Sequence, residues 1–125
     1  MMKDNESEEM YLETILILKN EKNFVRSIDI VEKMNFAKSS VSVAVNKMQK
    51  AGLINVDKNG GIELTLEGRK KAESVYEKHT IITEMLERLG VDSKSAEDNA
   101  CRIEHVISED VFDAIKDHLN KFKDK

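Results

Sequence analysis

The sequence contains no proline, a single cysteine and no apolar run long enough to cross a membrane. A bilayer-spanning helix needs about 20 predominantly apolar residues, so the sequence excludes a membrane-spanning protein. One cysteine cannot form an internal disulfide, which favours a reducing compartment. The N-terminal segment KDNESEE is acidic, the opposite of a signal peptide. We therefore expect a cytoplasmic protein.

The composition points to a small helical protein with an uneven distribution of charge. Of its 125 residues 40% are hydrophobic, enough to bury the core of one domain or of two very small ones. A charged fraction of 35% without proline is typical of a helix-rich chain. The net charge is −4, but residues 33–62 contain five lysines and only one acid, Asp57. This basic strip is a candidate phosphate-binding surface, since phosphate attraction acts over short distances at physiological salt.

Three helices are predicted in the first half of the chain. Apolar side chains recur at helical spacing over residues 6–20. A short second helix, IDIVEKM, is expected to be capped by Ser27 and ended by Asn35. The third, KSSVSVAVNKMQKAG, has an apolar stripe and a left-handed cap at Gly52. That stripe is formed by Val41, Val45 and Met48. Two short helices joined by a tight turn, the second with a polar outer face, are typical of a helix-turn-helix.

A β-hairpin is predicted directly after the third helix. The segments LINV and IELTL are β-prone and flank DKNGG, and Asn-Gly is the strongest short-range hairpin signal. A hairpin in this place is a wing, so residues 6–66 read as a winged helix-turn-helix. The alternative at this point is a small α+β domain without a role in nucleic-acid binding.

The second half of the chain is predicted to be all helical. A long helix is expected over Glu67–Leu89 and another over roughly 94–107, with Asp92 and Ser93 as candidate caps. Ser108 is expected to open a last helix that ends near residue 122.

The fold class is therefore mainly α, in two parts. Residues 1–66 are predicted to form the winged helix-turn-helix domain, with its small β-hairpin wing, and residues 67–125 are predicted to form a second, all-helical domain. The helices over 94–122 have more apolar surface than so small a domain can cover. The residues concerned are Ile103, Val106, Ile107, Val111, Phe112, Ile115 and Leu119. They predict a twofold dimer, which would match a palindromic operator.

Cys101, Glu104 and His105 form the constellation that carries chemistry. At positions i, i+3 and i+4 of one helix their side chains leave the same face. Thiolate, carboxylate and imidazole are the three classes of side chain that bind first-row transition metals. Glu and His beside Cys on a core-facing stripe would be costly without a partner. Further candidate donors are Met10 and Glu13, one helical turn apart, and His79 on the long helix.

The chain resembles the metalloregulators that include the diphtheria toxin repressor, other iron-dependent repressors and the manganese transport regulator. The resemblance covers nearly the whole chain. It rests on EMYLETI, SSVSVAVNKMQKAGLI, LTLEGRKKA, KHTIITEMLERLGV and, most specifically, ACRIEHVIS. It implies a homodimer that binds DNA when metal is plentiful and represses metal-uptake genes.

The resemblance also implies a set of metal ligands. Met10, Cys101, Glu104 and His105 match the primary site of the iron type. His79 matches a ligand of the second site in that type and of the shared cluster in the manganese type. Glu13 matches a manganese-type ligand, and Glu97 stands where the iron type has a second histidine.

The predicted recognition helix departs from that of the relatives. Ser39 replaces a proline that many relatives have, and Val43 stands where the iron repressors have a glutamine. Serine and lysine mainly position phosphates, whereas asparagine can read adenine. The candidate DNA contacts are Lys38, Ser39, Ser40, Ser42, Asn46, Lys47, Lys50 and Lys58.

These observations predict a metal-dependent repressor, with Fe(II) as the physiological cofactor. Sulfur from Cys101 and Met10 disfavours Mn(II), although Mn(II), Co(II), Ni(II) or Zn(II) are possible in vitro. One alternative is a manganese-responsive repressor of the same family, and another is a winged-helix regulator that does not sense metal. A small metal-dependent enzyme is a third, but no second carboxylate or histidine motif suggests a catalytic pair. The protein is therefore not expected to be an enzyme.

Overall fold

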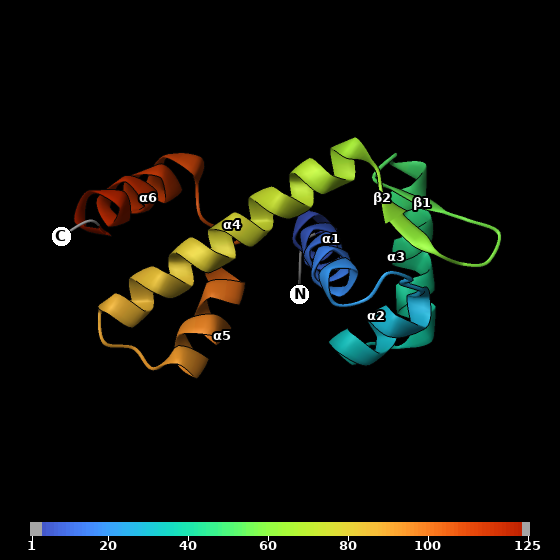
Figure 1. Ribbon diagram of the computed structural model, residues 1–125, viewed down its shortest axis with the longest axis horizontal. Coiled ribbons are helices and arrows are strands. Elements are labelled where there is room, and N and C mark those ends of the chain that lie inside the picture. Colours follow the sequence, from blue (N-terminus) through green and yellow to red (C-terminus); the bar gives the residue numbers. More distant parts are fainter. Residues whose placement is uncertain (1–3, 124–125) are drawn as a thin grey trace. The chain divides into compact units, whose positions relative to one another are not determined.

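A computed structural model of the protein describes residues 4–123. The elements are α1 (Asp4–Glu21), α2 (Ser27–Met34), α3 (Lys38–Lys50), β1 (Ile54–Val56), β2 (Ile62–Leu64), α4 (Leu66–Arg88), α5 (Ser93–Ile103) and α6 (Glu109–Lys123). The prediction of a mainly α fold with one β-hairpin is confirmed (Figure 1). The chain divides into two compact units, residues 1–73 and 74–125, and the division falls within α4. Within the described residues, no helix is long and apolar enough to cross a membrane.

The core of the first unit lies between α1, α2, α3 and the hairpin. The three helices pack on one another, and the strands pack on α1 and α3. The apolar stripe predicted for α3 is buried, as are Leu12 and Ile15 of α1 and Ile30 of α2. Ile54 and Ile62 complete the core from the two strands. Burial of one face of α3 leaves its opposite face available to solvent.

The start of α2 differs from the prediction. Its N-cap is Arg26, which has an extended backbone (φ −124°, ψ 169°), and Ser27 is already the first residue of the helix. The backbone N–H of Arg26 donates to the Asp29 carboxylate at 2.8 Å, and Lys22 donates to the same carboxylate at 2.7 Å. The hydrogen bond from Lys22, followed by that from the Arg26 backbone, holds the pKa of Asp29 below its usual value. The cap is therefore set by Asp29 and not by a hydroxyl at Ser27. At the other end, Asn35 ends the helix as predicted, and its backbone has the left-handed conformation (φ 57°).

The predicted wing is confirmed as an antiparallel pair in which Asn55 lies opposite Glu63. The connecting loop is held by Asp57, whose carboxylate accepts the backbone N–H groups of Asn59 at 2.8 Å and Gly61 at 2.9 Å. Gly60 has a positive φ of 84°, a conformation that costs little without a Cβ. Asp57, noted in the sequence only as an isolated acid, is the residue that orders the turn.

The second unit consists of the remainder of α4 with α5 and α6. The predicted cap of α5 is confirmed, because the Asp92 carboxylate accepts the backbone N–H of Ser95 at 3.2 Å. However, α5 ends at Ile103 and not near residue 107. Glu104 is its C-cap, and the N–H of Val106 donates to the Ile103 carbonyl at 3.0 Å in a tighter turn. The prediction that Glu104 and His105 lie inside the helix with Cys101 was therefore wrong: both follow its last residue.

Candidate metal centre and DNA-binding surface

Three potential metal donors meet in the second unit. His79 lies on α4, Cys101 on α5 and Glu104 at the end of α5, and one donor atom from each lies within 4.8 Å of the others. The His79 Nδ1 atom is 2.9 Å from Glu104 Oε2 and 3.9 Å from Cys101 Sγ. Imidazole, thiolate and carboxylate in one group suit a first-row transition metal.

Glu104 is the buried member of this group, with no exposed side-chain surface. Its Oε1 atom lies 3.3 Å from His105 Nε2, but no described residue donates a well-aligned hydrogen bond to this oxygen. Burial by itself would raise the pKa of Glu104, but His105 and His79 beside it outweigh burial and hold the pKa below its usual value. A buried, ionised carboxylate with an unsatisfied oxygen is costly unless a cation joins it, so this donor set fits a divalent metal.

The other predicted ligands lie in different places. The side chain of His105 is only 6% exposed and contacts Glu104. Glu97 is exposed on α5, one helical turn before Cys101, and is not in the group of three donors. Met10 and Glu13 belong to α1 in the first unit, where Met10 is half-buried and Glu13 is buried.

Lys78 is a residue of this region that sequence reasoning missed. Its side chain is buried and donates to Glu109 Oε1 at 2.6 Å, while its ammonium lies 5.9 Å from the centre of the Phe112 ring. These contacts join α4 to α6 at the residue that precedes His79. A lysine in a helix normally indicates a solvated face, so the sequence offers no clear signal for this anchor.

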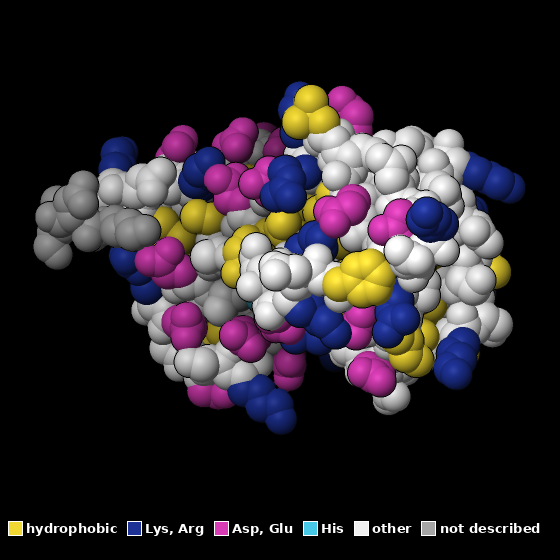
Figure 2. Space-filling model, turned by 45° about the vertical axis from the view of Figure 1, so that its right-hand side comes forward, with side chains coloured by type: hydrophobic (Ala, Val, Ile, Leu, Met, Phe, Trp, Pro, Cys, Tyr) yellow, Lys and Arg dark blue, Asp and Glu magenta, His cyan; other side chains and the backbone are white. Residues whose placement is uncertain are grey.

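The candidate DNA contacts lie on the surface of the first unit. All eight, namely Lys38, Ser39, Ser40, Ser42, Asn46, Lys47, Lys50 and Lys58, are exposed. Seven belong to α3, and Lys58 lies in the loop of the wing. Lys and Arg side chains, dark blue in Figure 2, project from this unit. Exposure of the polar face of α3 together with the wing is the arrangement that a winged helix uses to bind duplex DNA.

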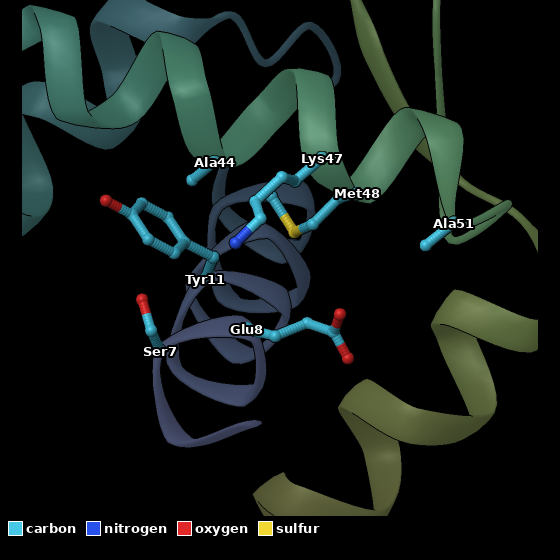
Figure 3. Close-up of a pocket in the computed structure, with 7 residues that line it drawn as sticks. All are labelled: Ser7, Glu8, Tyr11, Ala44, Lys47, Met48 and Ala51. Atoms are coloured by element: carbon cyan, nitrogen blue, oxygen red, sulfur yellow. The ribbon is translucent and has the colours of Figure 1, made fainter. Parts of the chain in front are cut away.

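A groove of about 330 Å³ separates α1 from α3 (Figure 3). Tyr11 and Lys47 reach into it from the two helices, and Met48 lies beside them. Glu8 also lines the groove and forms an ion pair with Lys71. Lys47 therefore lies at the edge of the α3 surface that is nearest to α1, whereas Lys50 does not line this groove.

Comparisons with known proteins agree with this geometry. Residues 5–62 match the N-terminal DNA-binding domain of iron-dependent repressors, and residues 65–125 match their metal-binding and dimerisation domain. The chain is 33% identical to an uncharacterised helix-turn-helix transcriptional regulator of Methanocaldococcus jannaschii, over 97% of this chain and 98% of that protein. It is 35% identical to the regulator MntR of Oceanobacillus iheyensis, over 94% of this chain and 80% of MntR.

Solved structures share the fold. The manganese regulator SloR matches with a TM-score of 0.78 and 29% identity over 95% of this chain, which spans 55% of the length of SloR. A winged helix joined to a unit with transition-metal donors defines a metal-dependent transcriptional repressor. The chain belongs to the family of iron-dependent repressors.

This membership confirms the resemblance that the motifs predicted. Members of the family bind DNA and divalent metals and dimerise through the C-terminal domain. They are transcriptional repressors, which confirms the expectation that the protein is not an enzyme.

Proposed function

We propose that this protein is an iron(II)-activated repressor that binds palindromic operators of metal-uptake or metal-homeostasis genes as a homodimer in the cytoplasm. Residues 1–66 would bind the operator and residues 67–125 would hold metal and dimerise. The observation that carries the proposal is the group of His79, Cys101 and Glu104, in which a buried carboxylate meets a thiol and an imidazole.

In this proposal, metal would be held by Cys101, Glu104 and His105 together with Met10 of α1. His79, whose Nδ1 atom lies 2.9 Å from Glu104 Oε2, would link this site to a neighbouring one that Glu13 completes. Glu97 would be the weakest contributor to that second site. When bound, the ion supplies positive charge and coordination bonds. Because the donors come from both units, they would favour the arrangement of the two units in which all of them meet, and binding to one arrangement shifts the population toward it.

Exposed apolar side chains in the second unit support the homodimer. Phe112 and Leu119 are buried, but Val106 is 70% exposed and Val111 is 47% exposed. Exposed apolar side chains are typical of an interface where they form a contiguous patch. A twofold dimer would present two copies of α3 to two half-sites of an operator.

Metal dependence is the direct test of the proposal. Operator binding should be measured by fluorescence anisotropy across Fe²⁺, Mn²⁺, Co²⁺, Ni²⁺ and Zn²⁺, each with a matched chelator control. We expect tight binding with Fe²⁺ and a loss of binding with chelator, because the proposed ligands include residues of both units. Equal operator affinity with chelator and with excess metal would contradict the proposal and favour a regulator that does not sense metal.

Selectivity for iron is expected to depend on sulfur. Replacing Cys101 with Glu and Met10 with Asp removes two soft ligands, so the double variant should respond to Mn²⁺ more strongly relative to Fe²⁺ than the unmodified protein does. The measurement is the metal concentration that gives half-maximal operator binding, under anaerobic conditions that keep the thiol reduced. If the unmodified protein already responds to Mn²⁺ at a lower concentration than to Fe²⁺, the sulfur argument is wrong.

A manganese-responsive repressor is the second candidate. The likeness to MntR and to the manganese regulator SloR favours it, as does Glu13, whose hard carboxylate suits Mn²⁺. The concentration series for the unmodified protein separates the two candidates directly.

Lys47 and Lys50 are proposed to contact phosphates. Replacing either with alanine should weaken binding to operator and to random DNA alike, and should lower the slope of log affinity against log salt by about one unit. The matched control is Lys94→Ala, an exposed lysine of α5 outside the DNA-binding unit, for which the slope should not change. An unchanged slope for both α3 variants would mean that α3 does not dock as proposed.

A further inference from the structure

Val43 is an apolar side chain on the outer face of α3. It is 61% exposed, although Val41 and Val45 on either side of it along the chain are buried. Two residues along an α-helix correspond to about 200° of rotation, so Val43 points away from the core almost directly. Single exposed apolar residues are common on protein surfaces. This one, however, lies at the centre of the face that carries the candidate DNA contacts.

The neighbours of Val43 leave room for a close approach. With Ser39, Ser40 and Lys47 it forms the α3 wall of a shallow hollow of about 390 Å³, whose other wall is formed by Ser7 and Tyr11 of α1. Serine side chains are short, so Val43 is accessible from the direction in which a DNA groove would lie. A β-branched residue also lowers helix propensity, and at this exposure Val43 recovers little of that cost by packing within the unit.

We propose that Val43 is a specificity-determining residue that packs against the 5-methyl group of a thymine in the major groove of the operator. In that groove, thymine alone among the four unmodified bases presents an apolar group, and the other base edges present only hydrogen-bond donors and acceptors. An apolar side chain against such an edge would leave polar atoms without partners. The inference rests on the proposed function and adds a thymine at a defined place in each half-site.

The experiment removes the methyl group alone. An operator is first selected from random duplexes with the metal-loaded protein, and each thymine of a half-site is then replaced in turn by deoxyuridine. We expect one position at which the unmodified protein binds about fourfold more weakly, the ratio that corresponds to one buried methyl-sized group. For the Val43→Ala variant, replacing thymine with deoxyuridine at that position should lower the affinity little further. Gln49→Ala changes another exposed residue of α3, and this variant should still bind the deoxyuridine operator about fourfold more weakly.

The variants are suited to this comparison because none changes the charge or removes a buried group. Circular dichroism should show that neither variant has less helix than the unmodified protein, since alanine is the better helix former at an exposed site. The inference is overturned if deoxyuridine has no effect at any position, or if Val43→Ala keeps the fourfold loss. If no sequence can be selected in the presence of metal, the proposed function is overturned as well. The inference alone fails if an operator is selected but the deoxyuridine result is not the expected one.

Discussion

Replacing Glu104 with glutamine is expected to lower metal affinity by at least about 100-fold. Mutation of a residue that only hydrogen-bonds to a metal ligand typically lowers affinity about 10- to 100-fold, and a direct ligand should matter at least as much. Glutamine has nearly the same shape but lacks the negative charge that the buried carboxylate supplies. At this site the charge is fully buried and lies between His79 and His105, so solvent cannot replace it. Affinity should be measured by Co²⁺ titration, followed by its absorption bands, and activation by operator binding in excess metal.

The matched control for this prediction is Asp98→Asn. Asp98 is exposed on α5, so its replacement removes one negative charge near the site without touching the donor group. We expect the control to keep its Co²⁺ affinity within about twofold, because exposed charges are strongly screened at physiological salt. Equal affinities for Glu104→Gln and the unmodified protein would exclude Glu104 as a ligand.

Local sequence signals predicted those parts of the fold that local chemistry decides. The α3 stripe follows from apolar periodicity, and the ends at Asn35 and Asp92 follow from capping chemistry. The start of α2 was misplaced because the serine at position 27 matches a common capping residue. In the structure the Asp29 carboxylate, reached from both Arg26 and Lys22, satisfies the cap instead. Competition between two capping arrangements cannot be resolved from residue preference alone.

The candidate metal site was only partly predictable. Spacing along the chain suggested that Cys101, Glu104 and His105 share a face, but the apolar pattern continues past Ile103 and conceals the end of α5. Packing of the end of α5 against α4 brings His79 into the group, and this tertiary contact has no signature in local spacing. The burial of Lys78 was invisible for the same reason, since it depends on Glu109 and Phe112 of another helix.

Gly68, in the first turn of α4, lies closer to the backbone of another segment than any other glycine does. A Cβ at this position would lie 1.9 Å from the carbonyl oxygen of Leu53 and 2.8 Å from its carbonyl carbon. Both are backbone atoms, so no side-chain rotation can relieve the clash. The same carbonyl oxygen accepts the N–H of Thr65 at 3.0 Å, and the hydroxyl of Thr65 donates to the Gly52 carbonyl at 2.7 Å. These bonds hold the start of α4 against the segment between α3 and β1.

Gly68→Ala is therefore expected to destabilise the protein by at least about 3 kcal/mol, the upper part of the usual cost of overpacking. Helix propensity alone predicts the opposite sign, a gain of about 1 kcal/mol when alanine replaces glycine inside a helix. The steric effect should dominate because relief of the clash requires α4 to move away from Leu53 and to break the bond from Thr65. The measurement is urea unfolding of the metal-free protein, so that metal binding does not contribute. Glu67→Ala, an exposed neighbour, is the control and should stay within about 0.5 kcal/mol of the unmodified protein. A more stable Gly68→Ala variant would show that α4 can start without its close contact to Leu53.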